Sequence, residues 1–124
     1  MIDTKTDKVL NLSTDLEQFT GTEHWYKHQF GGHYTDGVRY LAQTAGAYWL
    51  IDAIFSYRRA ERFQVWTLEV NPDLAGRTCP ATLTMREDTN APILVRQEIE
   101  YTDFPLGRVE LWLIDGVLIL PSEY

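Results

Sequence analysis

The hydrophobic periodicity of the chain changes near Arg62, and this change constrains the fold more than any other feature. Between residues 35 and 59, apolar side chains recur every three or four positions, as they do along the buried face of a helix. After Arg62 they alternate with polar side chains, as in strands with one buried face. Helices followed by strands predict an α+β fold, in which N-terminal helices pack on one face of an antiparallel sheet of about five strands.

The helical segment is expected to be divided in two. Thr35 or Asp36 can cap its start, and Gly46 stands where a C-cap would stand. The second part is apolar on most sides, yet it contains Asp52. A buried Asp52 would be a candidate general acid, whereas a helical wheel places it on the polar stripe of the helix, and we favour the stripe.

The rest of the N-terminal region gives weaker signals. Residues 1–10 are polar and predict a flexible tail, with a single domain over residues 11–124. Thr14 and Glu17 have the spacing of a capping box and predict a short helix over residues 14–19.

The strands are expected to form a meander, in which each strand pairs with the next. Asp115-Gly116 is the clearest hairpin signal and closes the C-terminal pair. The predicted strands cover residues 62–70, 81–87, 93–101, 108–114 and 117–120.

The charge and the apolar runs exclude some partners. The net charge is −7, and direct binding to nucleic acid normally requires a basic face, so no direct nucleic-acid binding is expected. The longest apolar run is too short to span a bilayer, so no membrane is expected. The single cysteine, Cys79, favours a reducing compartment, and the lack of a signal-peptide pattern favours a cytoplasmic protein.

The three histidines, His24, His28 and His33, lie within one ten-residue window. If residues 23–29 were helical, the first two would share a face and could bind zinc with a third ligand such as Glu23, Asp36 or His33. No spacing in the window fixes that third ligand, so His24, His28 and His33 are weak metal candidates and no cofactor is predicted.

The outer face of the predicted sheet is a second candidate site. Residues 87–124 hold eight acidic residues against two arginines. Alternation would turn Glu98 and Glu100 to the same side as Glu110 and Trp112, and a hairpin would bring them together. Because aromatic anchors dominate interface energetics, these four residues are the predicted partner-binding residues.

Five segments together resemble a family of small uncharacterised bacterial proteins. The resemblance implies a bacterial setting, which we associate with mobile elements, and it implies no catalytic residue. The segments are FTGTE (19–23), YTDGVRYLA (34–42), AYWLIDAI (47–54), YTDFPL (101–106) and the terminal LPSEY (120–124).

Two functions from different classes follow. The first is a non-enzymatic interaction module, of mobile-element origin, that binds a protein partner or itself through the acidic and aromatic sheet face. The alternative is a small metal-dependent or acid–base enzyme built on His24, His28 and His33. Since no nucleophile, phosphate-loop or dinucleotide motif is present, the first is favoured.

Overall fold

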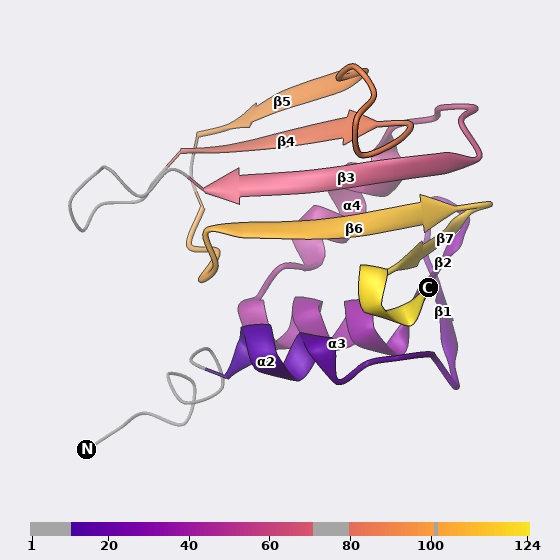
Figure 1. Cartoon of the computed structure of the whole chain (residues 1–124), viewed down its shortest axis with the longest axis vertical. Coiled ribbons are helices and arrows are strands. Elements are labelled where there is room, and N and C mark those ends of the chain that lie inside the picture. Colours follow the sequence, from indigo (N-terminus) through magenta and orange to yellow (C-terminus); the bar gives the residue numbers. More distant parts are fainter. Residues whose placement is uncertain (1–10, 71–79, 101) are drawn as a thin grey trace.

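The computed structural model describes residues 11–70, 80–100 and 102–124 (Figure 1). These residues form an α+β fold, as predicted, with three α-helices and a seven-stranded sheet. The sheet is mixed and larger than the five antiparallel strands expected from the sequence. The predicted tail over residues 1–10, Cys79 and residue 101 lie outside the described residues.

The elements follow one another along the chain as helix, hairpin, two helices and five further strands. Their bounds are α2 Leu12–Glu17, β1 Trp25–Lys27, β2 His33–Thr35, α3 Asp36–Ala45, α4 Tyr48–Ser56, β3 Phe63–Val70, β4 Ala81–Arg86, β5 Val95–Ile99, β6 Arg108–Ile114, β7 Val117–Ile119 and a 3-10 turn η1 Pro121–Glu123.

The helix boundaries are mostly those that the capping residues predict. Thr35 is the N-cap of α3, and its side chain accepts a hydrogen bond from the backbone N–H of Val38. Gly46 ends α3 with a φ of 64°, a left-handed conformation that glycine adopts without strain. The predicted Thr14–Glu17 capping box is wrong, because α2 has Asn11 as its N-cap residue and Thr14 lies inside the helix.

The predicted meander is also wrong. The strand order is β1-β2-β7-β6-β3-β4-β5, so β6 pairs with β3 and not with β5, which precedes it in the chain. Five consecutive residues of β3, from Gln64 to Leu68, are buried. This burial fits a strand with neighbours on both sides, and β3 accordingly has β4 on one side and β6 on the other.

Two turns shape the ends of the sheet. Asp115 and Gly116 have φ values of 49° and 84°, which fit the hairpin turn predicted between β6 and β7. Gly31 and Gly32, with φ values of 93° and 80°, reverse the chain between β1 and β2. This first hairpin joins the sheet through parallel pairing of β2 with β7.

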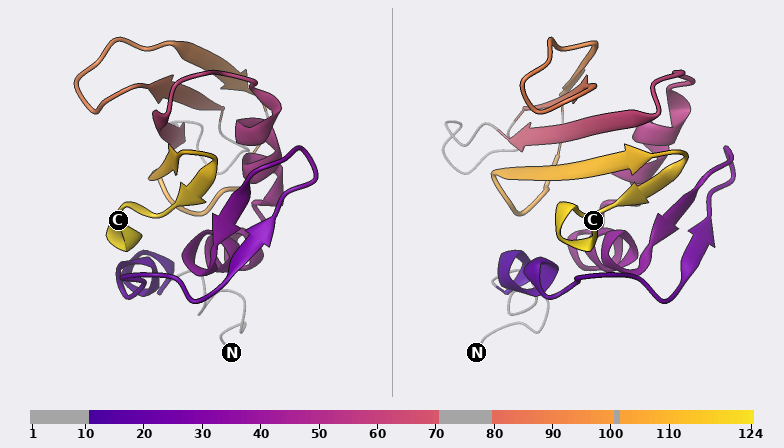
Figure 2. Two further views of the ribbon diagram at one scale, coloured as in Figure 1. Left: turned by 90° about the vertical axis from the view of Figure 1, so that its right-hand side faces the viewer. Right: turned by 45° about the vertical axis from the view of Figure 1, so that its right-hand side comes forward.

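The core lies between the helices and one face of the sheet. Trp66, Leu83 and Leu111 from the strands and Leu41 and Ile54 from α3 and α4 are at most 2% exposed. In Figure 1, α4 lies behind β3 and β6, and Figure 2 shows that the other face of the curved sheet is free of α-helices. No helix of the described residues is long and apolar enough to cross a membrane.

Candidate functional site

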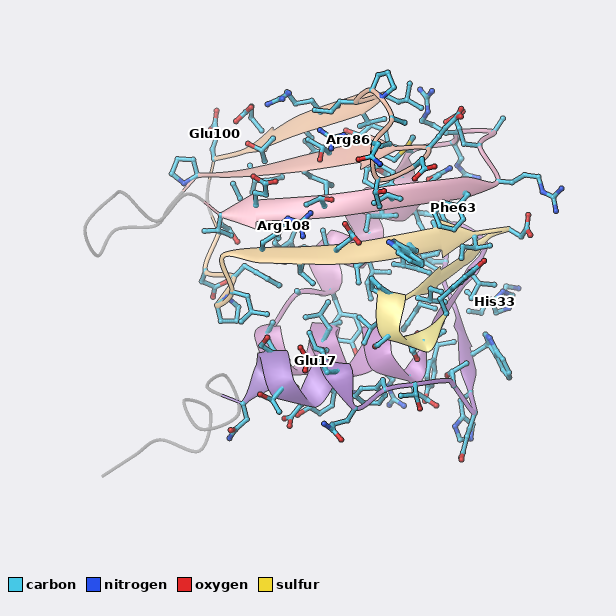
Figure 3. All side chains as sticks on the ribbon, in the orientation of Figure 1. Glu17, His33, Phe63, Arg86, Glu100 and Arg108 are labelled. Atoms are coloured by element: carbon cyan, nitrogen blue, oxygen red, sulfur yellow. The ribbon has the colours of Figure 1, made fainter. Side chains whose placement is uncertain are left out.

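The open face of the sheet, turned away from α4, is the clearest candidate for a functional surface. We use "open face" for the outward side chains of β3 to β7. Figure 3 shows Arg86 and Arg108 on this face, toward the viewer. Its central positions, Val65 and Thr67, are nevertheless 3% and 8% exposed, because longer side chains on the neighbouring strands flank them. The open face is therefore a shaped surface with a floor and walls.

One end of the open face carries three aromatic rings, which we call the aromatic cluster: Phe63, Trp112 and Tyr124. The centroid of the Trp112 ring lies 5.4 Å from that of Phe63 and 5.4 Å from that of Tyr124. Tyr124 is nonetheless 79% exposed. The indole N–H of Trp112 donates to Glu110 Oε2 over 3.1 Å, which fixes the orientation of the ring.

The other part of the open face contains a polar groove of about 280 Å³. Three threonines and three arginines are among the residues that line it. Its lining residues are Thr67, Glu69, Thr82, Thr84, Arg86, Ile93, Arg96 and Arg108. The arginines come from β4, β5 and β6, so the strand order, and not the chain order, brings them together.

The four predicted partner-binding residues do not form a single patch. Glu110 and Trp112 are on β6, whereas Glu98 is on β5 and Glu100 follows it. Since β3 and β4 lie between β6 and β5, these pairs are about 14 Å apart, at roughly 4.8 Å per strand. The hairpin expected to join them does not exist, and the polar groove occupies the space between.

His28 is a packing residue whose two ring nitrogens are both engaged. The backbone N–H of Phe30 donates to its Nδ1 over 3.0 Å, so the proton of the neutral ring is on Nε2. Nε2 lies 2.7 Å from Asp52 Oδ1 and donates to it. The ring stacks on Phe55 with centroids 4.7 Å apart and is 6% exposed.

The other two histidines lie apart from it. Residues 25–27 form a strand and not a helix, so His24 and His28 do not share a helical face. His24 is exposed, with Nδ1 3.6 Å from Asp36, and His33 is an exposed residue of β2. Among the described residues, no group of three or more histidine, cysteine, aspartate or glutamate side chains is arranged to hold a metal ion.

The two aspartates near the histidines have different surroundings. Asp52 is 53% exposed on the polar stripe of α4, as the helical wheel indicated. Asp36 accepts hydrogen bonds from the Tyr26 hydroxyl and from the backbone N–H groups of Glu23 and His24. These bonds, the one from Tyr26 above all, lower the pKa of Asp36 to about 2.

Comparison with known proteins places the chain in a family. The model of DUF6876, a family of unknown function, matches residues 10–124. The chain belongs to this family. No curated protein and no solved structure is significantly similar to it. The DUF6876 match covers every helix and strand described above, so the open face and the aromatic cluster both belong to the family domain.

In this DUF6876 domain, three of the segments singled out from the sequence meet at the start of α3. Thr22, from FTGTE, accepts a hydrogen bond from the backbone N–H of Asp36. Glu123, from the terminal LPSEY, accepts from the Thr35 hydroxyl over 2.6 Å and from the backbone N–H of Gly37 over 3.2 Å. We call these contacts the α3 latch. These hydrogen bonds give the residues a structural role, so no catalytic role is needed to explain their presence in these segments.

The sequence does not predict the polar groove. Arg96 and Arg108 stand out in it only as the two arginines that face eight acidic residues over residues 87–124. Nothing near Arg86 in the sequence marks it as part of a site. The available signal was that three outward positions on three separate strands carry arginine in a chain of net charge −7.

Proposed function

We propose that this protein is a non-enzymatic binding module that holds a protein partner on the open face of its sheet. The observation that carries the proposal is the aromatic cluster. It lies on the face that no α-helix covers, and most of its Tyr124 side chain is exposed. Trp and Tyr are the residues that most often anchor interfaces, because they bury large areas at little entropic cost.

The charges around the cluster fit recognition of a protein segment. Glu110 orients Trp112 through its hydrogen bond, and its other oxygen lies 3.4 Å from Arg108. Glu98 and Glu100 lie at the far side of the face. A partner that crosses the strands would meet an apolar anchor first and charges of both signs beyond it, and such rim charges act mainly on specificity and association rate.

The enzyme alternative has no specific observation in its favour. Both ring nitrogens of His28 are engaged, and His24 and His33 are exposed residues that lie apart from it, so the three histidines do not share one site. Among the described residues, no histidine lines the polar groove or the apolar hollow between α2 and the C-terminal segment.

The proposal is tested by affinity capture from an extract with a double variant, Trp112→Ala and Tyr124→Ala. A matched control is Trp25→Ala, which removes a 57%-exposed tryptophan from β1. We expect one protein to be recovered with the wild type and the control and lost with the double variant. In a separate variant that keeps both aromatic residues, reversal of Glu98, Glu100 and Glu110 to lysine should also weaken recovery.

Two outcomes would change this conclusion. Equal recovery of the same protein by the double variant would contradict the role of the open face. A wild-type protein that elutes as a dimer, and as a monomer when Trp112 and Tyr124 are replaced, would identify the partner as a second copy of the chain.

A further inference from the structure

Two arginines of the polar groove, Arg86 and Arg96, have no carboxylate partner among the residues that the structure describes. Among the ion pairs of the described residues, Arg108 is matched by Glu69 and Glu110, at 3.9 Å and 3.4 Å. None of these ion pairs includes Arg86 or Arg96. On the β6 and β3 side of the groove, two carboxylates therefore outnumber one arginine, whereas the β4 and β5 side carries the two arginines without an ion pair.

The strand register places the two unpaired arginines around one hydroxyl. Thr84 lies directly opposite Arg96 on β5, and Arg86 follows it two residues later on the same side of β4. Neighbouring positions of this kind are separated by about 5 to 7 Å. A single oxyanion can therefore accept hydrogen bonds from two guanidinium groups and a hydroxyl at these positions. On its other side Thr84 faces Thr67, which also lines the groove.

Arg86 gives an independent indication. Its Nε atom is buried and has no hydrogen-bond partner within the part of the chain that the structure describes. A buried donor of a charged group without a partner is costly, and native structures keep such donors chiefly where a function or a bound group accounts for them. An anion bound by the part of this guanidinium that lines the groove would compensate the charge of the partly buried arginine.

We propose that the polar groove is a binding site for a phosphate monoester, with its phosphate group between Arg86, Arg96 and the Thr84 hydroxyl. The tetrahedral group offers three acceptor oxygens to donors that approach from β4, β5 and the floor, whereas a planar carboxylate offers two. The groove, at about 280 Å³, has room for an organic group beside the phosphate, and Ile93 supplies an apolar wall for it.

The acidic residues near the groove determine where in it an anion can bind. Glu69 and Glu110 share Arg108, and Glu98 Oε2 lies 3.4 Å from the Thr82 hydroxyl. These carboxylates repel an anion from the β6 side and from the start of β4. The phosphate is thereby confined to the Arg86 and Arg96 side of the groove. This site does not depend on the protein partner proposed above.

The test is calorimetric titration of the whole chain with phenyl phosphate. We expect saturable binding that is weakened about tenfold or more by Arg96→Gln or Arg86→Gln, the loss of one charge-assisted hydrogen bond. Arg58→Gln, which removes the same charge from an exposed position outside the groove, is the matched control and should bind as the wild type does. Arg96 is exposed, so its variant keeps the fold even if replacement of Arg86 does not.

Three results would overturn the site: no saturable binding of phenyl phosphate, equal weakening by Arg58→Gln and Arg96→Gln, or benzoate binding as tight as that of phenyl phosphate. Titration with phosphoserine, free and within a short peptide, separates two sources of the same chemistry. Equal affinities support a free phosphorylated molecule, and tighter peptide binding supports a phosphorylated protein. The Trp112→Ala, Tyr124→Ala variant should still bind phenyl phosphate, which separates this site from the proposed function.

Discussion

The carboxylate of Glu123 accepts a hydrogen bond from the backbone N–H of Gly37 over 3.2 Å, so the C-terminal turn caps the first turn of α3. The same carboxylate accepts from the Thr35 hydroxyl and from the backbone N–H of Leu120. A negative group at a helix N-terminus is also favoured by the helix dipole. The α3 latch thus holds the C-terminal turn against the start of α3.

Replacement of Glu123 by alanine should remove all three of these hydrogen bonds. We expect a loss of about 1 to 3 kcal/mol in the free energy of unfolding, because two backbone donors and a buried hydroxyl lose a charged acceptor. Urea denaturation measures it. Glu87→Ala, at an exposed position, should change stability by less than about 0.5 kcal/mol. Similar stabilities of the two variants would show that the latch contributes little.

Gly37→Ala tests the same contact by placing a methyl group between α3 and the C-terminal turn. A Cβ at Gly37 would lie 2.6 Å from Leu120 Cδ1 and 2.7 Å from Glu123 Oε1. Both atoms end side chains, but Leu120 is buried and Glu123 is held by hydrogen bonds, so neither moves freely. We expect a loss of about 1 kcal/mol or more, despite the better helix propensity of alanine. Thermal denaturation beside Gly21→Ala, where a Cβ meets nothing within 4 Å, supplies the comparison.

Asp36 makes stability depend on acid pH. Its pKa is about 2 in the folded protein and 3.8 without the fold, so the unfolded chain binds the proton more readily. The stabilisation is complete above about pH 4 and is lost as the pH falls toward 2. In urea titrations across this range, Asp36→Asn should reduce the slope of the free energy of unfolding against pH. Asp115, whose pKa Arg62 also lowers, contributes to the slope that remains. A slope identical to that of the wild type would contradict the assignment.

His28→Ala should destabilise the protein by about 2 kcal/mol, because it leaves a cavity beside Phe55 and removes the acceptor of the Phe30 N–H. His33→Ala, at an exposed position of β2, should be nearly neutral. Chemical denaturation of both variants distinguishes packing from metal binding. If zinc raised the stability of the wild type and not of either variant, the histidines would be ligands after all.

The helices could be predicted because their signals are local. Thr35 caps one helix through its side chain, and Gly46 ends the same helix through its left-handed backbone conformation. The hairpin at Asp115 and Gly116 is local in the same way. Hairpin β1–β2 was missed because its strands have three residues each, which is too short to show a period of two.

The candidate site was harder to predict, since it depends on strand order. Sequence alternation correctly turned Glu98, Glu110 and Trp112 toward one side of the sheet. It could not show that β3 and β4 come between β5 and β6, because that order depends on the pairing of β3 with β6, which is distant in the sequence. The polar groove exists only as a result of this order, so Arg86 carried no signal by itself.

The parallel pairing of β2 with β7 sets an order of events during synthesis. Hairpin β1–β2 leaves the ribosome early, but its only partner strand in the described sheet is β7, near the other end of the chain. Contacts so distant in sequence are slow to form. The N-terminal hairpin and the start of α3 must therefore wait for nearly the whole chain, and a product cut short before β7 would leave both without the segment that completes them.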